Sequence, residues 1–241
     1  MKDVRVYAHA AALAWAAASC FVSLAVEAQA ARGRFVVALA GGSTPEAAYE
    51  LLAGEAFFGG VDWSRVQVLF GDERAVPPDH VDSNYRMARE TLLARVPIPG
   101  ENVHRIQGER EPAEAARRYQ IELETVLGEN GRFDLIFLGM GSDGHTASLF
   151  PGTPALEERE RLVVANPVRA LERTRITLTL PAINAARQVV FLVSGASKAA
   201  ALAAVLAGEP LPAARVLPED GQVTWLVDRD ARAASRAGTV E

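Results

Sequence analysis

The chain of 241 residues has an ordinary composition for a folded protein, with 49% hydrophobic and 23% charged residues, and is long enough for one well-packed α/β core. Its formal net charge is −5, and the basic residues are scattered, which argues against a nucleic-acid or membrane surface but allows a local basic pocket. Cys20 is the single cysteine, so an internal disulfide is excluded and a reducing, cytoplasmic compartment is expected.

The first long apolar segment, "AHAAALAWAAASCFVSLAVEAQAARGR", has two interpretations. It follows two basic residues and ends in small residues, as a secretory signal does. However, alanine is the best helix former, and Leu13, Ala17, Phe21 and Leu24 recur at helical steps on one face. We therefore expect a core helix that ends near Gly33, because a core-forming strand follows at once.

Apolar runs rich in β-branched residues alternate with helical stretches along the rest of the chain. The pattern predicts strands at 34–40, 65–70, 133–139, 161–165, 175–180, 188–195 and 222–227, and helices at 45–53, 83–95, 112–127, 182–187 and 197–207. Several strands are apolar without alternation, as in a parallel sheet covered on both faces. We expect a single α/β domain over residues 1–241, with a doubly wound, mainly parallel sheet flanked by helices. Ligands of such sheets bind beyond the carboxyl ends of the strands.

The segment "ALAGGSTPEAAYELL" follows the first of these strands. Two glycines turn the chain, and Ser43 or Thr44 is expected to cap a helix that has Pro45 in its first turn. Backbone N–H groups around Gly42, together with the helix dipole, would suit a phosphate. An ordinary strand–turn–helix connection explains the same residues, and the Walker pattern is absent.

Charged residues cluster where the strand at 65–70 should end. Asp72 and Glu73 could accept hydrogen bonds from sugar hydroxyls, and Arg74 could clamp a phosphate or an oxyanion. A solvated turn with local ion pairs is the alternative. Ser83 is expected to cap the helix that follows.

The segment "FDLIFLGMGSDGHTASLFPG" contains glycines with the spacing of a dinucleotide-binding loop. Such a loop needs a long helix directly after the glycines, but Pro151 and Gly152 stop any helix here. A polar catalytic turn is the better interpretation. His145 can exchange a proton near neutrality, and Asp143 could orient it or hold a substrate hydroxyl. The alternative is a histidine that merely caps a short helix.

A further strand–glycine–helix device occurs in "FLVSGASKAAALAAVL". Lys198 falls in the first helical turn, where a lysine opposes the helix dipole, so it is expected to serve an anion rather than to face solvent. Arg173 and Arg175, just before "ITLTL", offer further cations near the sheet.

Five segments in order, "LAGGSTP", "FGDERAVP…SNYRMARETLL", "FDLIFLGMGSDGHTASLFPG", "RITLTLPAIN" and "FLVSGASKAAAL", resemble the 6-phosphogluconolactonase family of the oxidative pentose phosphate pathway. The resemblance implies a modified Rossmann-like fold akin to glucosamine-6-phosphate isomerases and ribose-5-phosphate isomerases. It also implies hydrolysis of a small-molecule sugar phosphate, 6-phospho-D-glucono-1,5-lactone, to 6-phospho-D-gluconate, with no metal and no organic cofactor.

Carried onto this chain, the resemblance implies that His145 is the general base that activates water against the lactone carbonyl C1, with Asp143 orienting the site. Whether Arg74 contacts the phosphate or the developing oxyanion stays open. The motifs and the resemblance together predict these substrate-binding residues: Gly42, Ser43, Thr44, Asp72, Arg74, Arg175 and Lys198.

Two other functions share these motifs. A glucosamine-6-phosphate isomerase or deaminase has the same G-x-G-x-D-G-H turn, but carries Asp-Glu-Tyr where this chain has Asp72-Glu73-Arg74, and Asn-Glu-Pro where it has "SLFPG". A sugar-phosphate sensor without catalysis would not need His145 and Asp143. We expect no nucleic-acid or membrane partner, and a monomer or a weak homodimer.

Overall fold

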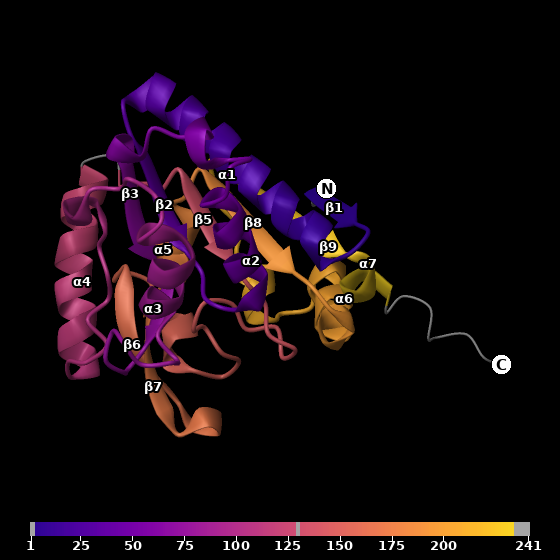
Figure 1. Ribbon diagram of the computed structural model, residues 1–241. Helices are drawn as coiled ribbons and strands as arrows, with labels where there is room; N and C mark the ends of the chain where they lie inside the picture. Colours follow the sequence, from indigo (N-terminus) through magenta and orange to yellow (C-terminus); the bar gives the residue numbers. More distant parts are fainter. Residues whose placement is uncertain (1–2, 129–130, 234–241) are drawn as a thin grey trace.

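The main sheet of the computed structural model, which describes residues 3–128 and 131–233, has six strands. Their order is β1-β9-β8-β5-β2-β3, and every neighbouring pair is parallel. Helices flank the sheet (Figure 1). The strands are β1 (Asp3–Tyr7), β2 (Phe35–Leu39), β3 (Val66–Phe70), β5 (Leu135–Leu138), β8 (Gln188–Val193) and β9 (Gln222–Asp228). The helices are α1 (Ala10–Arg32), α2 (Ser43–Leu52), α3 (Asn84–Ala88), α4 (Pro112–Leu127), α5 (Leu180–Asn184), α6 (Ala199–Ala207) and α7 (Arg229–Arg232).

The chain reverses its direction of travel across the sheet between β2 and β5. From β2 it moves outward to β3, whereas β5, β8 and β9 follow one another in the opposite direction. The predicted doubly wound, mainly parallel fold is thus confirmed. The crevice at such a reversal is where ligands of open α/β sheets bind.

A second sheet stands apart from the first. It contains β4 (Asp72–Arg74), β7 (Arg173–Leu178) and β6 (Val163–Val168), all paired antiparallel, and the β6–β7 hairpin projects away from the main sheet (Figure 1). The strands expected at 161–165 and 175–180 therefore do not extend the parallel sheet. The polar start of β7, with Arg173 and Arg175, could not be buried on both faces of a parallel sheet. The expected turn at Asp72–Arg74 is a short strand because it pairs with β7.

The Ala-rich segment is a core helix in the structure. Leu13, Ala17 and Phe21 are fully buried along one face of α1, while His9 caps its start and Gly33 ends it in the left-handed conformation. α1 is also the one helix among the described residues that is long and apolar enough to cross a membrane by length and composition, a test that buried core helices pass as well. β1, which precedes α1, was not predicted from the sequence.

Two other helices depart from their predicted bounds. The helix expected at 83–95 is α3 followed by a π-helical turn, Arg89–Leu93. Ser83 accepts a hydrogen bond from the Arg86 N–H and caps it, as predicted. The helix expected at 182–187 begins earlier, as α5.

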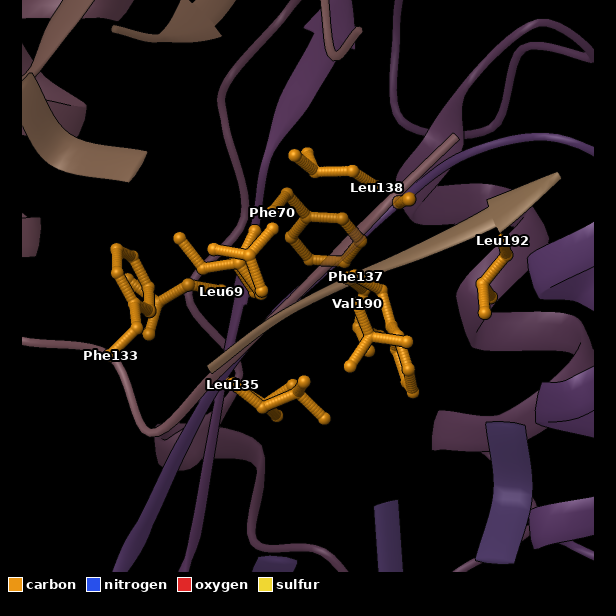
Figure 2. Packing of buried hydrophobic residues seen from close by; sticks show 14 of the residues in the cluster. Leu69, Phe70, Phe133, Leu135, Phe137, Leu138, Val190 and Leu192 are labelled. Carbon is orange, nitrogen blue, oxygen red and sulfur yellow. The ribbon is translucent and has the colours of Figure 1, made fainter. Parts of the chain in front are cut away.

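Aromatic and branched side chains from the central strands fill the interior. Phe70 of β3, Phe137 of β5 and Val190 of β8 lie on one face of the sheet and Leu69 of β3 lies on the other (Figure 2), and all four are at most 1% exposed. Such packing holds the strand ends in fixed positions relative to one another.

Two buried tyrosines bind the backbone where β2 and β3 end. The Tyr49 hydroxyl bonds both the N–H and the carbonyl of Ala40, at 2.9 and 3.0 Å. The Tyr119 hydroxyl does the same at Phe70, at 2.7 and 3.0 Å. Because Gly41 and Gly71 follow directly, the tyrosines hold the two strands at the points where they leave the sheet.

Removing either hydroxyl should destabilise the fold. Tyr49→Phe and Tyr119→Phe each leave a buried backbone donor and acceptor without a partner, so each should lower the free energy of unfolding by about 2–3 kcal/mol, measured by urea denaturation. Tyr85→Phe is the control, because the Tyr85 hydroxyl has no hydrogen-bond partner in the described part of the chain. Equal stability of all three variants would contradict this role.

Candidate active site

Four loops meet at the carboxyl ends of β8, β5, β2 and β3, which are neighbours in the sheet. They enclose a cavity of about 260 Å³. Most of the predicted site residues line it: Gly42, Ser43, Thr44, Asp72, Arg74, His145 and Lys198. Asp143 contacts the His145 ring but does not itself line the cavity, and Arg175 lies outside the cavity, beside Arg74.

The loop after β2 presents the start of α2 to the cavity. Gly42, at φ 105°, is the cap residue, so Ser43 lies inside the first turn, and no side chain caps this helix. The prediction that Ser43 or Thr44 caps the helix is therefore wrong, because the helix already begins at Ser43 and the cap position falls on Gly42. The first turn, at the positive end of the helix dipole, lines the cavity, and no side chain among the described residues caps its backbone N–H groups. This arrangement suits an anion.

The loop after β5 holds an aspartate–histidine pair. The His145 Nδ1 lies 2.6 Å from the Asp143 Oδ1, which also accepts the His145 backbone N–H at 3.1 Å. The Phe150 ring stacks on the imidazole with centroids 4.1 Å apart. Burial raises the pKa of Asp143, but the hydrogen bonds from His145 outweigh it and leave this pKa below its ordinary value. With the Nδ1 proton donated to Asp143, Nε2 carries the lone pair and can act as a base.

The backbone of this turn leaves no room for other side chains. A Cβ at Gly141 would overlap the His145 Nδ1 and the Asp143 Oδ1, so only glycine permits the pair to pack against the chain. Ala147, which lines the cavity, has φ 46° although it is not a glycine. Such conformations cost energy and persist only where the surrounding structure enforces them.

Asp72 is held by a buried hydrogen-bond network. The Ser148 hydroxyl donates to its Oδ2 at 2.6 Å and the Asn84 amide donates to its Oδ1 at 3.1 Å. Asn166 in turn donates to the Ser148 carbonyl at 2.8 Å. Asp72 is only 9% exposed and lines the cavity. The network from Asn84, Ser148 and Asn166 sets its position from three separate segments.

Glu73 is a structural carboxylate. It accepts the backbone N–H groups of Arg74, Asn84 and Tyr85, each at 2.8 Å, and the Ser83 hydroxyl at 3.0 Å. Burial raises its pKa, against the effect of these hydrogen bonds. Glu73 thus ties β4 to the start of α3 and does not face the cavity.

The loop after β8 is held by Asp228 at the end of the neighbouring strand. Asp228 accepts the Ser194 hydroxyl at 2.5 Å and the Gly195 N–H at 3.1 Å, and it caps α7 through the Ala231 N–H at 2.8 Å. Lys198, at the end of this loop, lines the cavity, and its side-chain amine has no hydrogen-bond or ion-pair partner among the described residues. The cavity therefore contains an unpaired cation together with the start of α2.

Several residues of the site were not predicted from the sequence. Phe150, Ser148 and Asn84 orient His145 or Asp72, and their roles depend on contacts between distant segments that no spacing rule encodes. His104 lies outside the cavity, where its ring nitrogens are 2.9 Å from Glu122 and 2.8 Å from Gln67. No group of three or more histidine, cysteine, aspartate or glutamate side chains among the described residues is placed to hold a metal ion.

Gly141 should be irreplaceable in this turn. Gly141→Ala should displace the His145 imidazole and shift its ring signals among those of the four histidines in a proton NMR spectrum. Gly139→Ala is the matched control, because a Cβ there meets no atom within 4 Å and Gly139 does not have positive φ. Unmoved signals in Gly141→Ala would show that the pair does not depend on the close approach of the backbone.

Asp228 should make stability depend on pH. Burial raises its pKa, but the hydrogen bonds from Ser194, Ala231 and Gly195 lower it below the ordinary value of 3.8. At a pH between the pKa of Asp228 in the folded protein and its pKa in the unfolded chain, the unfolded chain binds more protons. The stabilisation by Asp228 is therefore complete above the unfolded-chain pKa and is lost as the pH falls through the folded-state pKa.

Asp228→Asn should therefore lower the free energy of unfolding by about 2 kcal/mol at neutral pH, and its deficit should shrink as the pH falls below 3.8. Denaturant unfolding across this pH range measures the effect. Asp230→Asn, at an exposed position in the first turn of the same helix, is the control and should stay within about 0.5 kcal/mol. A deficit in Asp228→Asn that is independent of pH would contradict the assignment.

Known proteins share the sequence and the fold of this chain. A family described as glucosamine-6-phosphate isomerases/6-phosphogluconolactonase matches residues 8–225. A 6-phosphogluconolactonase of Synechocystis is 44% identical over 220 residues, with 88% of this chain and 89% of the relative covered. The human 6-phosphogluconolactonase is 43% identical over 219 residues, with coverage of 87% and 83%.

Solved structures agree with the sequence matches. The 6-phosphogluconolactonase from Trypanosoma cruzi superposes with a TM-score of 0.86 at 30% identity, covering 98% of this chain and 97% of that one. A monomeric glucosamine-6-phosphate deaminase, at 24% identity and a TM-score of 0.82, shares the fold. The resemblance stated from the motifs is thus confirmed, and the chain belongs to the glucosamine-6-phosphate isomerase/6-phosphogluconolactonase family.

Proposed function

We propose that the chain hydrolyses 6-phospho-D-glucono-1,5-lactone to 6-phospho-D-gluconate on a single domain. The observation that carries the proposal is one cavity lined by an imidazole, by a lysine with an unpaired amine and by the start of a helix that has no side-chain cap among the described residues. The relatives named as 6-phosphogluconolactonases support the hydrolase class. The partner of this cavity is a small-molecule sugar phosphate, the substrate.

Phosphate binding is assigned to the cationic side of the cavity. The backbone N–H groups of the turn at Gly42, Ser43 and Thr44 would bind phosphate oxygens, and Lys198 would neutralise their charge. Arg74 extends from β4 toward the same space. A phosphate fixed at these groups orients the rest of the sugar, so that binding energy is converted into alignment of the ester carbon.

Proton transfer is assigned to His145. Its Nε2 would take a proton from water as the oxygen attacks C1, and the imidazolium that forms is stabilised by Asp143 at Nδ1 and by the Phe150 ring. The imidazolium could then protonate the departing ring oxygen. A lactone is an activated ester, so one base, a positioned water and donors for the oxyanion suffice. Asp72 would accept a hydrogen bond from a sugar hydroxyl through an oxygen held toward the cavity.

An assay of lactone loss tests the proposal. The purified protein should consume freshly prepared lactone well above its spontaneous hydrolysis, and His145→Asn should lower turnover by about 10²–10⁴-fold, the usual worth of a general base. The affinity of His145→Asn for 6-phospho-D-gluconate should stay within a few-fold, because the phosphate groups are untouched.

The matched control is His9→Asn. His9 caps α1 and does not line the cavity, and asparagine is itself a good cap, so this variant should retain full turnover. Wild-type protein that only matches the spontaneous rate would refute the lactonase proposal. Ammonia release from glucosamine 6-phosphate would instead identify a deaminase.

A further inference from the structure

A second cavity adjoins the active site and shares Arg74 with it. Its volume is about 390 Å³, and it lies between β4, β7, the segment that follows β4 and the first residue of α4. Among the residues that line it, three are arginines, one is a histidine and none is a carboxylate: Arg74, Ala75, Val76, His80, Pro112, Arg173, Thr174 and Arg175. We call it the arginine cavity.

Strand register brings the arginines together. Arg74 on β4 lies directly opposite Arg175 on β7, so the two side chains project from the same face of the small sheet. Arg173, two residues before Arg175, projects from that face as well. Like charges directly opposite one another destabilise a sheet, so this arrangement has a cost that needs compensation.

The protein compensates this charge only in part. Asp82 forms an ion pair with Arg173 at 3.1 Å, and its backbone carbonyl accepts a hydrogen bond from Arg74. The Nε of Arg175 is buried and has no hydrogen-bond partner among the described residues. An unpaired buried N–H of a charged group is costly. Burial and the neighbouring Arg74 guanidinium lower the pKa of Arg175, which shows how poorly its charge is balanced.

We propose that the arginine cavity is a second anion-binding site, for inorganic phosphate or for the phosphate group of a phosphate monoester. Arg175 and Arg173 each present a guanidinium group to the anion, and Arg74 is shared with the catalytic cavity. Forked guanidinium donors around one space match the oxygens of a doubly charged phosphate better than those of a single carboxylate.

Sharing of Arg74 couples the two cavities. An anion in the arginine cavity partly neutralises the positive charge of Arg74 and thereby lowers the affinity of the catalytic cavity for a sugar phosphate. By linkage, a sugar phosphate in the catalytic cavity lowers the affinity of the arginine cavity by the same factor. Inorganic phosphate should therefore raise the KM for the lactone more in the wild type than in Arg173→Met. This coupling rests on the proposed function, whereas anion binding itself does not.

Titration of the full chain with inorganic phosphate, followed through the arginine Nε–H signals in ¹H–¹⁵N NMR spectra, tests the site. The Arg175 signal, identified by its absence in Arg175→Met, should shift and saturate. Arg173→Met should weaken that response by at least about tenfold. In Lys198→Met, which alters only the catalytic cavity, the phosphate affinity reported by the Arg175 signal should stay within about twofold of the wild type. The same is expected of Arg169→Met, which removes an exposed arginine from the same hairpin.

Two results would overturn the proposal. One is an Arg175 signal that does not respond to phosphate. The other is loss of its response in Lys198→Met, which would place Arg175 in the catalytic phosphate site. A protein that binds phosphate at Arg175 but does not hydrolyse the lactone would refute the proposed function and leave the second site standing.

Discussion

Neighbouring parallel strands end at the same edge of a sheet, and this constraint assembles the active site. β8, β5, β2 and β3 are consecutive in the main sheet, so the loops that carry Lys198, His145, Ser43 and Asp72 lie side by side in that order. His145 therefore shares one cavity with the lysine and the helix start that would anchor a phosphate. None of these residues is near another of the four in sequence, and only the order of the strands brings them together.

Electrostatic balance distinguishes the carboxylates of the site from its cations. Four carboxylates each accept two or more hydrogen bonds from protein groups, which compensate their charges and orient the loops: Asp72, Asp143, Glu73 and Asp228. The Lys198 side-chain amine has no such partner in the described part of the chain. The cavity is thus left with a net attraction for anions, even though the chain as a whole is acidic.

Sequence reasoning predicted the parallel core and seven of the residues that line the cavity, because buried strands and glycine turns have strong local signals. It did not predict that β6 and β7 belong to a second sheet, since the pairing of β7 with β4 depends on contacts between segments about a hundred residues apart. The Ser43 cap was wrong because the conformation of Gly42 moves the helix start. Phe150 and Ser148 were missed for a related reason: the first stacks on the His145 ring and the second binds a distant carboxylate, and neither contact has a sequence pattern.

The central claim is that one cavity anchors a sugar's phosphate at its cationic side and holds the ester carbon against an imidazole. A crystal structure with 6-phospho-D-gluconate bound measures this directly. The account predicts phosphate oxygens within about 3 Å of the Ser43 N–H and the Lys198 amine, and the C1 carboxylate beside the His145 Nε2. A product bound outside this cavity, or with its phosphate at His145 and its carboxylate at Lys198, would contradict the account.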